Sequence, residues 1–275
     1  MTDTTTFICY FYACLEPPKL GKTQANYCHV MIYLGFIVFV LGVSLLLYVL
    51  FGGADYGAGI LELFAPRGSR PWLRSMTYRA IGPVWEANHI WIILVIVILF
   101  AGFPAVFASL STYLHLPLLA LLLGIIFRGA AFAFRHYDAV QDGSQQVYNQ
   151  VFRWSSLITP FFLGLTAGAI QYGAVPAELP SDFYSGFVAP WWNGFSFSMG
   201  LFVSAICAYL AAAFLLGETQ DAHQRHRLVR AARLSALVVV GTGGLVFAAS
   251  WLEGVGLVQR FLDQPLSLVL LALAT

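Results

Sequence analysis

Two acidic side chains stand where a membrane protein would place groups that handle protons. Asp55 follows a long apolar run, and Glu86 lies in the first turn of another, just after Pro83. A carboxylate that is partly removed from water favours its neutral form and can therefore take up and release protons. The same residues could instead cap helices, or pair with Arg128 or Arg135 at the end of a third apolar run. The residues alone leave both interpretations open.

The other candidate residues give weaker signals. His89 could bind a haem or a metal, but it has no evident partner, and a hydrogen-bonded polar edge shared with Asn88 explains it better. The 4 cysteines show neither CxxC nor zinc-site spacing, so we expect no disulfide framework and no metal site. Phosphate-binding loops, HExxH and GxSxG are absent from the sequence, which excludes these soluble-enzyme chemistries.

The composition places these residues in a membrane protein. Of 275 residues, 59% are hydrophobic and only 10% are charged, whereas about a quarter of an ordinary soluble protein is charged. The aromatic content of 16% also fits a protein in a bilayer. The net charge of +1 gives no electrostatic footprint for nucleic acid. We therefore predict an all-α, polytopic transmembrane helical bundle.

Apolar stretches near ~20 residues predict the transmembrane helices. Six full spans are expected, at residues 31–54, 84–108, 116–134, 155–175, 195–216 and 234–252, with a truncated seventh from Pro265. Pro104 and Pro160 are expected to break the second and fourth spans. The first, third and fifth loops are rich in arginine, so they are predicted to be cytoplasmic, with the N-terminus outside. We expect residues 1–30 to be a non-native or disordered extension, and residues 31–275 a C-terminally incomplete membrane domain.

Three segments resemble subunit II of the cytochrome bd-type quinol oxidases. They are DYGAG from Asp55, GPVWEANHIW from Gly82, followed by LFAGFP from Leu99, and FRGAAFAFR from Phe127. The corresponding family patterns are D-x-G-x-G, then G-P-x-W-[DE]-x-N-x-x-W with an aromatic-Pro ending of the second span, then a third-helix signature. The similarity covers the chain from Met31 onward and is densest over residues 50–136.

The resemblance implies a multi-pass subunit of a respiratory complex, in the bacterial inner membrane, that oxidises quinol and reduces dioxygen to water. In that family haem b, haem d and the quinol-oxidation site belong to subunit I. This chain would then carry no catalytic residue, metal or directly bound cofactor. The resemblance does not decide whether this subunit binds a structural quinone. Its implied partners are subunit I in a heterodimer, with or without a small accessory subunit, and membrane lipid.

The resemblance also assigns roles to individual residues. By motif position, Asp55 and Glu86 match acidic residues of the proton path. The implied polar and aromatic lining of the same region consists of Trp85, Asn88, His89 and Trp91, and the implied structural charges are Arg128 and Arg135.

Two positions depart from the family pattern. Ala133 stands where members usually have an acid, which is expected to leave Arg128 and Arg135 short of a counter-charge. Gly52 stands where some members carry a second acid. The alternatives are a proton-coupled transporter, in which repeated broken helices are expected, and a purely structural membrane partner.

Overall fold

The computed structural model describes residues 22–82, 85–137, 144–173 and 182–263. Within these ranges the side chains of residues 22–30, 85, 86, 136, 137, 258, 260 and 261 lie outside the description. The described ranges contain helices and no strand, which confirms the all-α prediction. In chain order the elements are α2 (Lys22–Leu47), η1 (Tyr48–Gly52), α3 (Gly53–Phe64), η2 (Arg67–Ser69), α4 (Arg70–Ile81), α5 (Trp85–Gly102), α6 (Pro104–Tyr113), α7 (His115–Tyr137), α8 (Ser144–Tyr172), α9 (Phe183–Phe187), α10 (Gly194–Glu218), α11 (Ala222–Leu252) and α12 (Leu257–Asp263).

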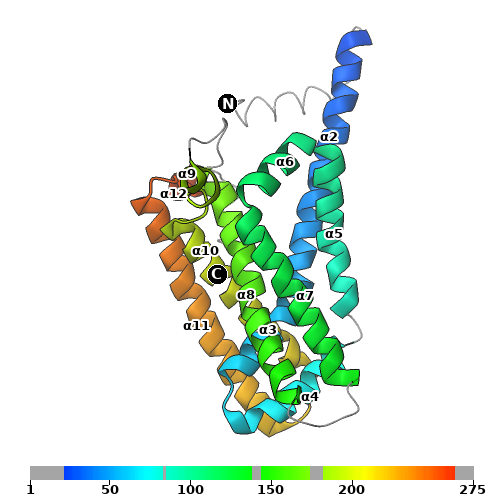
Figure 1. Ribbon diagram of the computed structural model, residues 1–275, viewed down its shortest axis with the longest axis vertical. Helices are drawn as coiled ribbons and strands as arrows, with labels where there is room; N and C mark the ends of the chain where they lie inside the picture. The colour runs from blue at the N-terminus through cyan, green and yellow to red at the C-terminus, as the bar shows by residue number, and fades with distance from the viewer. Residues whose placement is uncertain (1–21, 83–84, 138–143, 174–181, 264–275) are drawn as a thin grey trace.

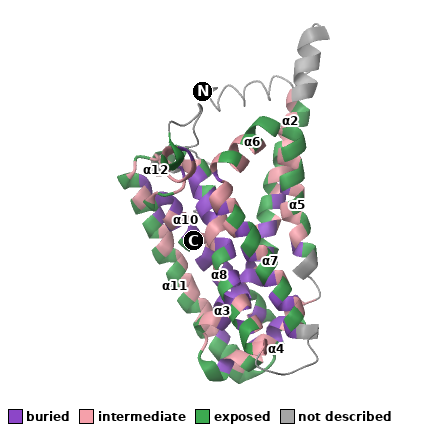
Figure 2. Cartoon of the chain, in the orientation of Figure 1, coloured by how far each residue is buried: buried purple, intermediate pink, exposed green. Residues whose placement is uncertain are grey.

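The core of the molecule is a bundle in which α8 and α10 are central. Helix α8 packs against α7, α10 and α3, while α10 also packs against α11 and α3. Helices α2 and α5 pack mainly on each other and on η1, and they form one side of the molecule (Figure 1). Buried residues are concentrated on α3, α8 and α10 (Figure 2).

Among the described residues, four helices are long and apolar enough to cross a membrane. They are Met31–Phe64, His115–Arg135, Gly194–Glu218 and Ala222–Leu252, and a bent pair, Ala87–Gly102 with Pro104–Tyr113, makes five if it counts as one span. The first candidate is continuous through η1, so it extends ten residues past the predicted end at Ala54. The fourth predicted span coincides with α8, which does not pass this test. The predicted seventh span, from Pro265, lies outside the described residues.

The two prolines that were expected to break spans behave differently. The second span bends by 116° at Phe103, because the ring of Pro104 disfavours helical backbone at the residue before it. Phe103 accordingly adopts φ −133° and ψ 57°. The prediction for Pro160 is wrong, since Pro160 lies inside the continuous helix α8. At the N-terminus, α2 begins at Lys22 and crosses the boundary expected at residue 31, and residues 1–21 are outside the description.

The three arginine-rich connections meet at one end of the bundle, which we call the arginine end. Arg74 of α4 and Arg135 of α7 contact the same carboxylate, that of Glu62. The Nη1 of Arg227 on α11 donates a hydrogen bond of 2.9 Å to Ser69 Oγ in the first connection. The first, third and fifth loops therefore share one side, as the alternating charge pattern predicts.

Glycines in the Asp55 motif allow α3 to lie directly against two neighbours. A Cβ added at Gly57 would lie 1.8 Å from the Cys207 carbonyl oxygen of α10, and one at Gly59 would lie 2.2 Å from Ser156 Oγ of α8. Small residues at such positions let helix backbones approach closely in membranes. The D-x-G-x-G spacing thus places Gly57 against α10 and Gly59 against α8, while Asp55 faces a third helix, α7.

Replacing Gly57 by alanine should separate α3 from α10. The added methyl group meets backbone that cannot move aside, and overpacking of this kind costs about 1–3 kcal/mol. We expect a clear fall in the thermal midpoint of the purified protein. Gly42→Ala is the matched control, because Gly42 lies in the same candidate span with no atom within 4 Å of an added Cβ. Equal midpoints for the two variants would contradict the close approach of α3 and α10.

Candidate functional site

A buried ion pair joins α3 to α7. The Nη2 of Arg128 donates to Asp55 Oδ1, and also to the Asp55 backbone carbonyl oxygen at 3.1 Å. Both side chains are 1% exposed. The Asp55 carboxylate therefore exchanges water for a guanidinium, which is the condition under which a buried charge is tolerated.

A second ion pair of the same kind lies about two helical turns further along both α3 and α7. Arg135 donates to Glu62 Oε2 at 2.9 Å, and Arg74 of α4 donates to Glu62 Oε1 at 3.1 Å. Because an α-helix has about 3.6 residues per turn, positions seven apart lie on one face. Asp55 and Glu62 on α3 thus face Arg128 and Arg135 on α7, and we call these four residues the ion-pair ladder.

Aromatic rings enclose the guanidinium groups of the ladder. The ring of Phe152 on α8 lies 5.2 Å from the Arg128 guanidinium carbon and 4.3 Å from that of Arg135. The ring of Tyr56 lies 5.0 Å from Arg128 on another side. Such cation–π contacts stabilise a desolvated cation. Phe152 is fully buried and contacts both arginines.

Tyrosine hydroxyls complete the surroundings of the ladder. The hydroxyls of Tyr48 and Tyr56 lie 3.0 Å apart. The Tyr78 hydroxyl of α4 donates to the Phe132 carbonyl oxygen of α7 at 2.8 Å. Burial raises the pKa of Tyr78, although Arg135 and Arg74 oppose the shift. Tyr78 therefore keeps its proton and remains a donor at neutral pH.

Several buried polar atoms of this region have no hydrogen-bond partner within the described part of the chain. They are Asp55 Oδ2, Arg128 Nε and Nη1, and Ser156 Oγ. Asp55 therefore has one oxygen held by Arg128 and one that can accept a further hydrogen bond or a proton. A fixed carboxylate with an open oxygen is chemically suited to proton transfer.

The second sequence motif meets the site at the π-helical turn η1. Asn88 of α5 is 5% exposed and donates from Nδ2 to the Phe51 carbonyl oxygen at 3.4 Å. His89 and Trp91 are half-buried on the same helix. The side chains of Trp85 and Glu86 lie outside the described residues. The structure thus joins the Asn88 motif to the segment that immediately precedes Asp55.

The expectation that Arg128 and Arg135 lack a counter-charge is wrong. Both are paired on α3, so Ala133 leaves neither arginine unbalanced. The sequence motifs do not identify Glu62, because this residue lies beyond the predicted end of the first span at Ala54, although it belongs to α3. The signal that could have found it is the common spacing: Asp55 to Glu62 equals Arg128 to Arg135.

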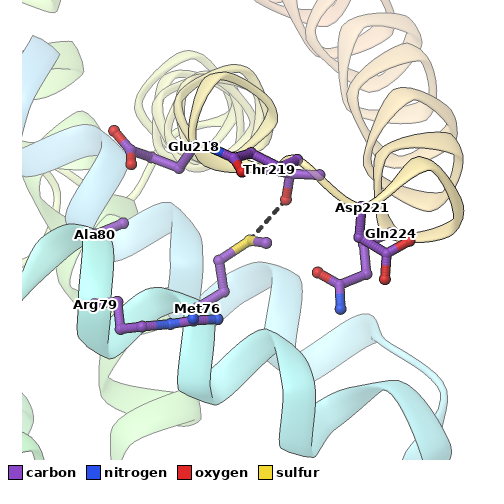
Figure 3. Close-up of a pocket in the computed structure, with 8 residues that line it drawn as sticks. Met76, Arg79, Ala80, Glu218, Thr219, Asp221 and Gln224 are labelled. Atoms are coloured by element: carbon purple, nitrogen blue, oxygen red, sulfur yellow. Dashed lines mark hydrogen bonds between the residues drawn. The ribbon is translucent and has the colours of Figure 1, made fainter.

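A separate pocket of about 490 Å³ lies between α4, the end of α10 and the start of α11. Its lining combines one basic and two acidic side chains with amides: Met76, Arg79, Ala80, Glu218, Thr219, Gln220, Asp221 and Gln224 (Figure 3). Thr219 Oγ1 donates to Met76 Sδ at 3.4 Å across it. The four residues of the ladder are not among those that line this pocket.

A metal or haem centre requires side chains that are free to act as ligands. Nowhere among them do three or more His, Cys, Asp or Glu side chains come together as metal ligands. The two ladder carboxylates are occupied by arginine, which does not suit a cation. The ladder therefore does not fit a metal or haem centre.

Comparison with known proteins finds the same family that the sequence motifs resemble. Residues 34–275 match the family described as cytochrome bd terminal oxidase subunit II. The chain belongs to this family. The chain is 28% identical over 201 residues to cytochrome bd ubiquinol oxidase subunit 2 of Bacillus subtilis (strain 168), covering 72% of this chain and 56% of the relative. It is 26% identical over 209 residues to cytochrome bd-I ubiquinol oxidase subunit 2 of Escherichia coli (strain K12), covering 73% of this chain and 52% of the relative.

This subunit II family member spans about half the length of the curated relatives it matches. The matched range contains α3, α5 and α7, and hence the whole ion-pair ladder. The ladder therefore lies within the part of the chain that matches the family.

A double-mutant cycle on Asp55 and Arg128 should reveal strong coupling. Arg128→Gln leaves a buried carboxylate without its partner, which costs about 3–5 kcal/mol. Adding Asp55→Asn removes that charge, so the double variant should be less destabilised than the sum of the single variants. Thermal midpoints of the purified proteins measure the effect. Simple additivity of the two substitutions would contradict a direct ion pair.

Proposed function

We propose that this chain is the second subunit of a bd-type terminal oxidase, which couples quinol oxidation to reduction of dioxygen to water. In this proposal haem b, haem d and the quinol-oxidation site lie in subunit I, and this subunit supports assembly and proton uptake. The arginine end faces the cytoplasm of a bacterial inner membrane, because arginine-rich loops are retained there during insertion. Family membership and the relatives named as ubiquinol oxidase subunits support the proposal.

The observation that carries the proton role is the open oxygen of Asp55. Asp55 lies inside the candidate span Met31–Phe64, fully buried, with Oδ1 bound to Arg128 and Oδ2 unpartnered among the described residues. Arg128 favours the carboxylate at rest, while the low-dielectric surroundings favour neutralisation when a proton arrives. A proton taken up at Oδ2 therefore need not break the contact at Oδ1.

Glu86 is proposed as the second acid of the same route. Helix α5 begins at Trp85, so Glu86 lies in its first turn, where the helix dipole favours a carboxylate. Two residues later Asn88 bonds to η1, which leads directly into α3. The start of α5 therefore lies next to the segment that leads into Asp55.

A purely structural role for Asp55 is the second candidate. The ion pair with Arg128 and the parallel pair at Glu62 favour it, since both contacts join α3 to α7. The structural role and the proton-carrying role predict different effects when asparagine, a neutral residue of the same shape, replaces Asp55. A structural acid is needed for assembly, whereas a proton carrier is needed for turnover.

Asp55→Asn should lower oxygen consumption with a soluble quinol by about tenfold or more, because the amide cannot carry a proton. The haem absorption spectrum of the purified complex should stay unchanged. Glu218→Gln serves as the control, since it removes an exposed acid at the same end of the bundle. Loss of haem together with activity would favour the structural candidate, and full activity with normal haem would refute the proton role.

Glu86→Gln tests the second acid independently. We expect slower turnover with intact haem content, and a larger deficit at high pH, where protons are scarce for uptake. Rates of oxygen reduction measured across a pH series give the comparison. A wild-type pH profile in the Glu86→Gln complex would remove Glu86 from the route.

A further inference from the structure

Positive charge exceeds negative charge around Glu62 at the arginine end. Glu62 is in direct contact with Arg74 and Arg135. Arg70 and Arg153 lie close enough that their charges act on the same group of residues. Among the described residues, two guanidinium groups thus contact the Glu62 carboxylate and two more lie near it, so this set of five carries three positive charges in excess.

The donors of these arginines are only partly used. Arg70 donates from Nε and Nη2 to the carbonyl oxygens of Ala65 and Leu63 at the end of α3. Arg153 donates from Nε to the Asn149 carbonyl oxygen of its own helix at 3.0 Å. The Nε atoms of Arg74 and Arg135 are likewise buried without a partner there.

The burial of these side chains makes the imbalance significant. Arg153 is 6% exposed and Arg135 is 9% exposed. Burial lowers the pKa of Arg153, Arg70 and Arg74 lower it further, and Glu62 opposes them. Buried guanidinium groups that repel one another are stabilised by an anion placed among them.

We propose that Arg70, Arg74 and Arg153 form a binding site for a phosphate oxyanion beside Glu62. Arginine presents a planar fork of donors that matches phosphate oxygens, so a cluster of forks suits this ligand better than a single halide ion. The Arg74 side chain is 31% exposed, which gives the ligand access from outside the bundle. Helix α4 supplies Arg70 and Arg74, and α8 supplies Arg153, so the anion would join these two helices.

Two sources can supply this chemistry, inorganic phosphate and the headgroup of an anionic lipid. Basic pockets between helices on the cytoplasmic side of membrane proteins bind such headgroups. The site lies where the helices end, at the level at which headgroups are expected. Its occupation does not depend on quinol oxidation, so a failure of either proposal leaves the other testable.

The test uses the full chain purified with its partner subunit and stripped of lipid. Equilibrium dialysis with labelled inorganic phosphate forms one arm, and native mass spectrometry with cardiolipin against phosphatidylcholine forms the other. We expect saturable binding in at least one arm, and the arm that binds identifies the source. Arg153→Gln should weaken that binding about tenfold or more, as expected for the loss of a charged hydrogen-bonding fork.

Arg225→Gln is the matched control, because it removes the same charge from an exposed position near the start of α11. The affinity of this variant should remain within about twofold of the unmodified protein, as expected for an exposed surface charge that solvent and salt screen. If Arg153→Gln lowers the thermal midpoint, Arg153→Lys replaces it, since lysine keeps the charge but loses the fork and should bind with intermediate affinity. Absence of saturable binding in both arms, or equal loss in the Arg153 and Arg225 variants, overturns the proposal.

Discussion

The pairing of two carboxylates on α3 with two guanidiniums on α7 constrains the rest of the structure. Charges inside an apolar bundle are tolerated only when they are paired. Because both pairs have the same seven-residue spacing, any shift of α3 along α7 would break both contacts together. The ladder therefore fixes the register of the two helices, and α4 is attached to the same register through Arg74.

Close helix packing makes this register possible. Gly57 and Gly59 bring α3 against α10 and α8, and Phe152 of α8 then reaches between the two ladder arginines. A larger residue at Gly57 would push α3 away from α10, and one at Gly59 would push it away from α8. The acids and glycines of the Asp55 motif consequently act together: the glycines set the distance between helices, and Asp55 uses that distance to reach Arg128.

The sequence predicts the helical membrane fold and the bend at Pro104, because apolar run length and proline stereochemistry are local properties. It does not predict that Pro160 is accommodated within α8, nor that the first helix continues to Phe64. Asp55, Arg128 and Arg135 were identified as important, yet their pairing depends on which helix faces which. Glu62 was missed for the same reason: hydropathy assigns a charged residue to a loop, whereas its partners on α7 and α4 keep it inside the bundle.

Asp55 thus combines a structural contact with an oxygen that has no partner among the described residues, and the ion pair with Arg128 requires its carboxylate to be ionised at rest. Infrared difference spectroscopy between the purified wild-type complex and its Asp55→Asn variant measures that state directly. The account predicts that the substitution removes the bands of an ionised carboxylate. Loss of a protonated carboxyl carbonyl band instead would show that Asp55 is neutral at rest, and would contradict the ion pair with Arg128.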